Sequence, residues 1–380
     1  MAIVTYYYSP LYGGLETQLL ILSKFLVMKG FRVTVYTSRP VGTTNEEIDA
    51  GVRILRFGKS ETVRGLEEAY NEIITKLEKS INNFDILYMP FGISPKYPIS
   101  LQLKVAGIFF AKHKPVVLRI TSSGRITELL HFDSKLVSFL KQVSKIIALN
   151  SGIALELRNA GVKNKSIFRV NNSVDVNRFK PIYISETKNS HNNKELRFIY
   201  PCRICEKKNI KDIIFDWNKA STLDVSFQNA QLLIVGDTNR GTEDRLLFKE
   251  ILKLVDLSKS KISILPALNY QEMPDLYRKS DILLCYSLQE GMSNTTLEAM
   301  ASGLPIISPS TEAFHELLID SPNYIFKDSL TRIDTLLKAI RDYKEWNRIG
   351  LFNRKRIIKK FSTDVILPKY YKMFINLVSN

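Results

Sequence analysis

Two carboxylates eight residues apart enclose a short polar segment in the second half of the chain. Residues 290–298 read Glu-Gly-Met-Ser-Asn-Thr-Thr-Leu-Glu and continue as Ala-Met-Ala-Ser-Gly-Leu-Pro-Ile-Ile. This pattern predicts a turn that opens a helix, followed by a buried strand. Carboxylates accept hydrogen bonds from sugar hydroxyls, and N–H groups at a helix start bind phosphate oxygens. The segment therefore predicts a site for a polyhydroxylated ligand that carries phosphate.

A purely structural interpretation covers part of the same segment. Thr295 with Glu298 matches a capping box, and Gly303 followed by Pro305 is an ordinary helix end. Capping accounts for Glu298 but leaves Glu290 and the Gly-Met-Ser-Asn turn without a role. Taken alone, the segment fits a ligand site and a helix cap about equally well.

Two further groups of candidate residues follow predicted strands. Arg203 and Lys208 come after a strand at 196–200, and they supply fixed positive charge that can bind phosphate oxygens. Gly13 and Gly14 separate the first strand from a helix. These glycines either let another backbone approach a phosphate or an acceptor closely, or form an ordinary turn.

The elements that must position these residues alternate between strands and helices. We expect strands at 3–7, 32–37, 52–57, 85–89, 116–120, 146–149, 167–170, 196–200, 231–235, 262–265, 282–285 and 304–307. A polar stretch at 184–195 is typical of a linker. The alternation predicts an α/β fold with two doubly wound, parallel-sheet (Rossmann-like) domains. Ligands of such sheets bind at the carboxyl ends of strands, where each group of candidate residues falls.

The order of these motifs resembles that of the family 4 retaining glycosyltransferases, across nearly all 380 residues. The segments that carry the resemblance are 9–16, 200–209, 232–237, 276–281 and the Glu-x7-Glu segment 290–298. The resemblance implies GT-B architecture, in which two such domains face a cleft. The implied N-terminal, acceptor-binding domain spans 1–181 and is joined by a C-terminal helix at 363–380, and the implied donor-binding domain spans 195–360.

The resemblance also implies a role for each candidate residue. Its catalytic set consists of Glu290, Arg203 and Lys208. In this set Glu290 contacts hydroxyls of the donor sugar and the two cations contact the pyrophosphate, while Glu298 holds the ribose. The rest of the implied donor site is Gly291, Met292, Ser293, Asn294, Thr295 and Gly236. The implied acceptor or phosphate loop consists of Gly13, Gly14, Thr121, Ser122 and Ser123.

The activity that the resemblance implies is retaining transfer of a sugar from a nucleotide sugar, UDP- or GDP-linked, to a hydroxyl group. The acceptor would be a glycan or a lipid-linked molecule in cell-surface polysaccharide or glycoconjugate synthesis, and neither a cofactor nor a metal is expected. Thr121 stands where many family members have His, which puts the inherited donor preference in doubt. Two alternatives are a nucleotide-sugar epimerase of similar architecture and a catalytically silent relative that binds glycans or membranes.

Charge is concentrated in one part of the chain. The formal net charge is +16, and residues 101–180 contain 14 Lys and Arg against 4 Asp and Glu. This excess favours an anionic partner such as a membrane surface, a lipid pyrophosphate or an acidic glycan. Within it, Leu136, Leu140 and Val143 form a stripe flanked by lysines, which predicts either core packing or membrane insertion. Nucleic acid is disfavoured because no known binding module is evident.

Other classes of protein lack their sequence signals here. No apolar run approaches the roughly 20 residues of a membrane span, and the first eight residues are typical of a strand rather than a signal peptide. Three cysteines make no disulfide framework, so we expect a cytoplasmic protein that can reach the cytoplasmic membrane face. Cys202 and Cys205 form a lone Cys-x-x-Cys, which does not complete a zinc site. The glycine motifs of NAD and ATP enzymes are absent.

Overall fold

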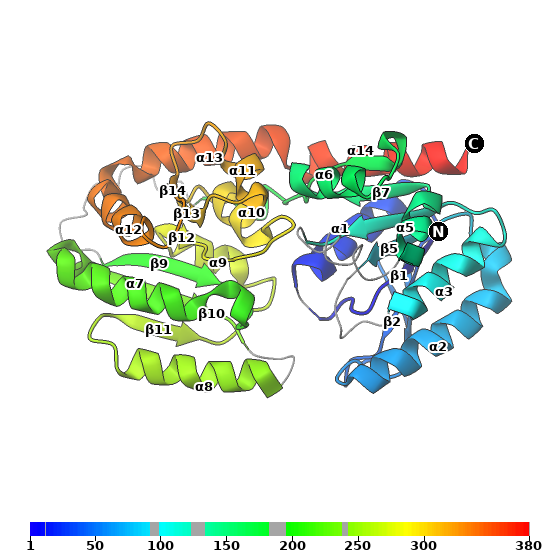
Figure 1. The fold of residues 1–380 in the computed structure, drawn as a ribbon, viewed down its shortest axis with the longest axis horizontal. Helices are drawn as coiled ribbons and strands as arrows, with labels where there is room; N and C mark the ends of the chain where they lie inside the picture. Colours follow the sequence, from blue (N-terminus) through cyan, green and yellow to red (C-terminus); the bar gives the residue numbers. More distant parts are fainter. Residues whose placement is uncertain (12, 92–98, 123–133, 182–194, 238–241, 380) are drawn as a thin grey trace. The chain divides into compact units, whose positions relative to one another are not determined.

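A computed structural model describes residues 1–11, 13–91, 99–122, 134–181, 195–237 and 242–379 (Figure 1). The chain divides into two compact units. The first unit consists of Met1–Asn172 with Asp364–Asn380, and the second unit is Ser173–Thr363. Each unit has its own sheet and its own core.

The first unit is built on an eight-stranded sheet with the order β3-β4-β2-β1-β5-β6-β7-β8. Every pairing is parallel except that of β3 with β4. The inner strands are continuous buried runs such as Val116–Ile120, as expected for a parallel sheet with both faces covered. The strands are β1 Ala2–Val4, β2 Thr34–Ser38, β3 Glu46–Asp49, β4 Val52–Phe57, β5 Leu87–Phe91, β6 Val116–Ile120, β7 Lys145–Ala148 and β8 Ile167–Arg169.

Side chains at the helix starts of the first unit show why those helices begin where they do. Thr62 accepts a hydrogen bond from the backbone N–H of Gly65 at the start of α2, and Asn150 accepts one from Ile153 at the start of α6. The helices are α1 Gly14–Met28, α2 Val63–Ser80, α3 Ile99–Phe110, α5 Ser134–Gln142, α6 Ser151–Asn159 and α14 Thr363–Val378, with short 3-10 turns at Ile81–Asn83 and Asn164–Ser166.

The apolar stripe of α5 faces the interior of the first unit. Leu136, Leu140 and Val143 are each no more than 2% exposed. The core-packing interpretation of this stripe is therefore confirmed, and membrane insertion of these three side chains is wrong. Lys141 is exposed near the end of α5, whereas Lys145 is half-buried at the start of β7 and donates a hydrogen bond to the backbone oxygen of Lys165.

The second unit is built on a six-stranded parallel sheet with the order β11-β10-β9-β12-β13-β14. Its strands are β9 Leu196–Pro201, β10 Ala230–Val235, β11 Ile262–Leu265, β12 Ile282–Leu284, β13 Ile306–Pro309 and β14 Tyr324–Phe326. Helices α7, α8 and α12 pack together, and so do α9, α10 and α13. The helices are α7 Ile210–Leu223, α8 Thr242–Asp256, α9 Met273–Arg278, α10 Asn294–Ala301, α11 Glu312–Leu318, α12 Arg332–Arg341 and α13 Trp346–Lys360, with 3-10 turns at Glu206–Lys208, Val225–Asn229 and Tyr343–Glu345.

The predicted fold class, two parallel-sheet α/β domains, is confirmed. The sequence analysis missed β3 and β14, both at sheet edges. Strand β3 reads Glu-Glu-Ile-Asp, and such an exposed, acidic edge strand lacks the apolar pattern by which strands are found. That the two domains face a cleft stays a prediction.

One arginine fixes the segment by which the chain enters the second unit. Arg354 of α13 donates hydrogen bonds to the backbone oxygens of Phe179 (3.0 Å) and Val176 (3.2 Å), and also to that of Ala301 at the end of α10. Val174 pairs with Ser362 in an isolated parallel bridge. Residues 173–181 therefore begin the second unit, whereas the predicted limit of the first domain was 181.

Candidate active site

The order of strands in the second unit reverses between β9 and β12. From β9 the chain order runs outward through β10 and β11, and from β12 it runs the other way through β13 and β14. Crevices at the carboxyl ends of strands on either side of such a switch point are the usual ligand sites of doubly wound sheets. Arg203 and Lys208 follow β9, and Glu290 follows β12, so the three predicted catalytic residues all follow strands of this switch point.

Lys208 and Glu290 are in direct contact across the switch point. The Lys208 ammonium donates to Glu290 Oε1 and, at 3.2 Å, to the hydroxyl of Ser287. The hydroxyl of Tyr200 donates to the backbone oxygen of Lys208 at 2.7 Å, which anchors the 3-10 turn that carries the lysine. Burial works against the charge of Lys208, but the Glu290 carboxylate outweighs it and raises the lysine pKa. The lysine is therefore a fixed cation.

Glu298 lies in a different environment on α10. It is only 8% exposed, and its Oε2 accepts a hydrogen bond of 2.9 Å from the hydroxyl of Tyr277. Burial raises the pKa of Glu298 to about 7, although the Tyr277 hydrogen bond and the positive charge of Arg178 both act to lower it. Near neutral pH this carboxyl group is consequently divided between its protonated and ionised forms.

The capping interpretation of residues 295–298 is wrong. The N-cap of α10 is Ser293, whose hydroxyl accepts from the backbone N–H of Thr296. The predicted cap, Thr295, is already inside the helix, and the carboxylate of Glu298 bonds to Tyr277 rather than to the helix start. Thr295 and Glu298 therefore form no capping box, and Glu298 has no role in capping α10.

The turn before α10 is compact. Gly291, Met292 and Ser293 are buried, and Asn294 and Thr295 are half-buried in the first turn of the helix. The hydroxyls of Ser293 and Thr295 lie 3.1 Å apart. All five predicted donor-site residues of this segment thus lie between Glu290 and Glu298 in one continuous turn and helix start.

Two predicted residues at the ends of β9 and β10 have different surroundings. A Cβ at Gly236 would lie 1.8 Å from the backbone oxygen of Cys202, so close packing of two strand ends requires glycine there. Arg203 is exposed, and the described part of the chain provides no ion pair for it. The structure therefore brings Lys208, Glu290 and Ser287 together but does not bring Arg203 into contact with them.

The glycine pair of the first unit has a local explanation that the sequence analysis missed. Gly13 is the N-cap of α1, and a Cβ on it would lie 2.3 Å from Oε2 of Glu16. Glu16 is 6% exposed and occupies the third helical position, where acidic side chains commonly turn back toward the helix start. The space left by Gly13 is thus taken by the protein's own carboxylate. The signal was present in the sequence as Gly-Gly-Leu-Glu.

Thr121 and Ser122 follow the carboxyl end of β6 and are half-buried, whereas Ser123 lies outside the described residues. The three cysteines are free. Burial raises the pKa of the Cys285 thiol to about 11 and also raises that of Cys202, so both are protonated at neutral pH. Among the described residues, no group of three His, Cys, Asp or Glu side chains is placed to hold a metal ion.

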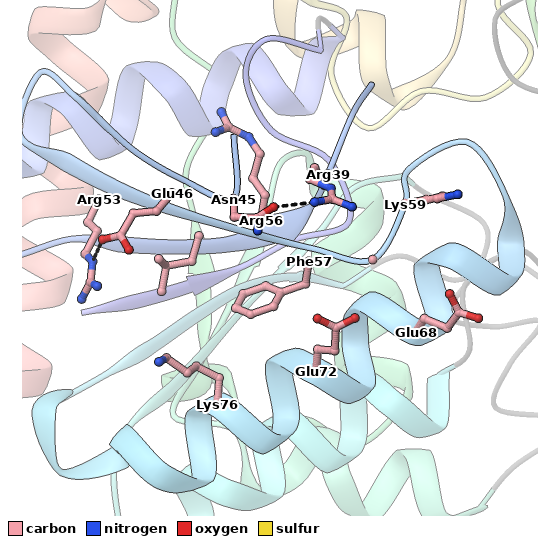
Figure 2. A pocket seen from close by; sticks show the side chains of 12 residues that line it. Arg39, Asn45, Glu46, Arg53, Arg56, Phe57, Lys59, Glu68, Glu72 and Lys76 are labelled. Carbon is pink, nitrogen blue, oxygen red and sulfur yellow. Dashed lines mark hydrogen bonds and ion pairs between the residues drawn. The ribbon is translucent and has the colours of Figure 1, made fainter. Parts of the chain in front are cut away.

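The first unit contains a cavity of about 490 Å³, and Figure 2 shows the side chains that line it. It lies between α2 and the β3–β4 pair, beside the carboxyl ends of β2 and β4. Phe57 contributes an aromatic surface, Arg53 bonds to Glu46 at 2.7 Å, and Arg39 bonds to Asn45. The residues that line the cavity include none of the predicted site residues.

Comparisons with known proteins agree with the two-unit division. The family "Glycosyltransferase Family 4" matches residues 12–178, and the family "Glycosyl transferases group 1" matches residues 195–342. The N-acetyl-alpha-D-glucosaminyl L-malate synthase of Bacillus anthracis is 22% identical over 305 residues, which are 78% of this chain and 76% of that protein. No helix among the described residues is long and apolar enough to span a membrane.

Solved structures show the same fold at low sequence identity. The sucrose-phosphate synthase of Thermosynechococcus elongatus superposes with a TM-score of 0.79 at 14% identity, covering 100% of this chain and 98% of that one. The HepE protein of Anabaena, solved in complex with UDP-glucose, superposes with a TM-score of 0.74 at 15% identity, covering 99% of this chain and 100% of that one.

Proposed function

We propose that this chain, which its two family matches place among the glycosyltransferases, transfers a sugar from a nucleotide sugar to a hydroxyl with retention of configuration. The observation that carries the proposal is the Lys208–Glu290 contact at the switch point of a doubly wound sheet, with Glu298 on the adjoining helix. We propose that one ligand contacts all three groups.

The chemistry assigned to these groups follows from the bond that breaks. The bond from the sugar to the diphosphate is cleaved, and the electron pair leaves with the diphosphate. A cation that is already in place stabilises that developing charge without reorganisation, which is the role of Lys208. In the proposed retaining step the acceptor oxygen attacks from the same face, and its proton passes to the departing phosphate. We propose that no metal or other cofactor takes part.

The carboxyl groups would serve the two ends of the donor. Glu290 would accept hydrogen bonds from the sugar hydroxyls, and Glu298 from the ribose hydroxyls. Arg203, which is exposed, would reach the pyrophosphate only when the donor is bound. The solved HepE complex with UDP-glucose supports a uridine-linked donor, with a guanosine-linked donor as the second choice.

The acceptor side belongs to the first unit in this proposal. The cavity of Figure 2 presents an aromatic ring, arginines, carboxylates and an amide, which are the groups that bind sugars in proteins. A glycan or lipid-linked acceptor is consistent with this cavity and with the basic charge of residues 101–180. We therefore propose a role in cell-surface polysaccharide or glycoconjugate synthesis, on the cytoplasmic side of the membrane. Gly14, Thr121 and Ser122, which do not line this cavity, are a second candidate for acceptor contact.

A thermal-shift panel of UDP-, GDP-, ADP- and dTDP-sugars tests the donor site. A ligand at 100 times its Kd adds about 2.7 kcal/mol to the free energy of unfolding. We expect one nucleotide series to stabilise the parent chain but not Lys208→Ala. Lys211→Ala, which removes an exposed lysine of α7, is the matched control and should keep the shift. Equal shifts in parent and Lys208→Ala would contradict the assigned site.

Product analysis separates the alternatives. Thr121 in place of the family's His is the observation that favours a silent relative. Such a protein would show the thermal shift without transfer to any acceptor or to water. An epimerase would instead change the sugar configuration of the nucleotide sugar without an acceptor. Transfer with release of nucleoside diphosphate would exclude both.

A further inference from the structure

Helix α13 has an unusual charge composition for a surface helix. Its 15 residues, Trp-Asn-Arg-Ile-Gly-Leu-Phe-Asn-Arg-Lys-Arg-Ile-Ile-Lys-Lys, include six cations and no acidic residue. A solvated helix usually interleaves both signs, because opposite charges three or four residues apart stabilise it. The positive charge of this helix is therefore not balanced within the helix and favours a partner outside it.

Only part of that charge is used inside the protein. Arg354 bonds to backbone oxygens of the entering segment and of α10, and Arg356 bonds to those of Leu317 (2.7 Å) and Glu316 (2.9 Å). Ile349 and Ile357 are buried on the same inner side of the helix. These contacts fix the rotation of α13 about its own axis, and they determine which residues face outward.

The outward face combines apolar side chains with cations. Leu351, Phe352 and Ile358 are 53%, 39% and 44% exposed. The cations Arg348, Lys355 and Lys359 are exposed as well. Each of them lies three, four or seven residues from one of the exposed apolar residues, so all six side chains lie on one side of the helix. Within this set only Arg348 has an ion pair among the described residues, with Glu345. We name these six residues the α13 face.

We propose that the α13 face is a docking surface for an anionic lipid bilayer. Three exposed apolar side chains would enter the headgroup region, while the cations would lie at the level of the lipid phosphates. A partner that offered only phosphates, such as a nucleic acid, would leave the exposed phenyl and aliphatic groups without a role. The inference concerns the second unit, is distinct from the basic region of the first unit, and does not depend on transfer activity.

Cosedimentation of the full chain with vesicles tests the proposal. The probes are vesicles of phosphatidylcholine alone and vesicles with about one quarter phosphatidylglycerol, each at low and high salt. We expect binding to the anionic vesicles that falls with salt, because surface charges are screened beyond the Debye length. Leu351→Ser/Phe352→Ser/Ile358→Ser and, separately, Lys355→Glu/Lys359→Glu should each lower this binding about tenfold or more.

The second unit supplies matched controls for both variants. Leu223, Val225 and Leu257 are 58%, 76% and 81% exposed, so their triple serine variant removes as many exposed apolar side chains from elsewhere. Lys249→Glu/Lys253→Glu reverses two exposed lysines with the same spacing on α8. Both control variants should bind vesicles like the parent chain, and melting curves should show that all variants fold.

Three results would overturn the proposal. The first is equal recovery of the parent chain with neutral and anionic vesicles, or recovery with neither. The second is a loss of binding in the control variants that equals the loss in the α13 variants. The third is a parent chain that self-associates through the α13 face, so that the serine variant changes its sedimentation coefficient but not its vesicle binding.

Discussion

Glu290 and Glu298 belong to one sequence motif, yet the structure gives them different electrostatic surroundings. Glu290 contacts the ammonium group of Lys208, and its carboxylate raises the pKa of that lysine. Glu298 contacts the neutral hydroxyl of Tyr277, and burial raises its own pKa to about 7. Identical side chains eight residues apart therefore have different partners, because the fold packs a different group against each of them. The first is a counter-ion, and the second can gain or lose a proton.

The largest expected effect on activity comes from removing Lys208, the cation that contacts Glu290 but not Glu298. Lys208→Ala should lower the rate of transfer by about 10²–10³, the usual cost of one lost contact to developing charge. It also removes the cation that pairs with the half-buried Glu290 and should destabilise the fold. The double variant Lys208→Ala/Glu290→Gln should regain stability but not activity, as measured by melting curves and by a transfer assay. Parent-like turnover of the single variant under saturating donor would remove Lys208 from the proposed mechanism.

Exchanging each carboxylate for an amide should separate the two roles. Glu290→Gln frees Lys208 from its counter-ion, so we expect nucleoside diphosphate to bind about tenfold more tightly while transfer is lost. Glu298→Gln has no contact with Lys208 and should bind the nucleotide no more tightly than the parent chain. Calorimetric titration with UDP, GDP and ADP measures both. If Glu290→Gln bound every nucleotide more weakly than the parent, the counter-ion role would be wrong.

The raised pKa of Glu298 predicts a dependence of stability on pH. Its pKa rises from an ordinary value of 4.5 to about 7 on folding. Between pH 4.5 and pH 7 the folded state therefore keeps a proton that the unfolded state has released. Stability should therefore fall as pH rises through this window, by about 3 kcal/mol in total, and the loss is complete above pH 7. Glu298→Gln should remove that loss in urea unfolding curves recorded from pH 4.5 to 8.

Asp216 needs its own control in this experiment. Burial raises its pKa to about 6, against the opposing effect of Arg332, so it contributes a slope of the same sign. Asp216→Asn should remove a different part of the pH dependence and leave the contribution of Glu298 unchanged. A slope that is identical in the parent chain and in Glu298→Gln would show that Glu298 is ionised throughout.

The smallest expected effect is that of metal removal. Because Lys208 supplies the positive charge in the proposed mechanism, activity after dialysis against EDTA should equal the initial activity. Loss on chelation that Mg²⁺ or Mn²⁺ restores would contradict the assignment of the leaving-group charge to side chains.

Sequence reasoning succeeded where one local pattern decides the structure. The runs at β6 and β9 predicted strands because short, mainly apolar runs of this length are typical of strands covered on both faces. It failed where two residues were equally possible by type and only packing in the folded chain decides between them. Thr295 and Ser293 are equally good caps by type, and only the fold shows that the helix begins after Ser293. The Lys208–Glu290 contact joins residues 82 positions apart, which requires the pairing of β9 with β12 that no local pattern shows.

The three hydrogen bonds of Arg354 have a mechanical consequence. One guanidinium joins the turn at residues 176–179 of the entry segment, the last turn of α10 and the middle of α13. We therefore expect these three pieces to open together, as one cooperative unit. Helix α10 carries Glu298. A force that displaces the entry segment would therefore act, through the hydrogen bonds of Arg354, on the helix that positions this carboxyl group. Amide exchange at Phe179 and at Ser302 should then share a single opening free energy, and Arg354→Leu should lower both by the same amount.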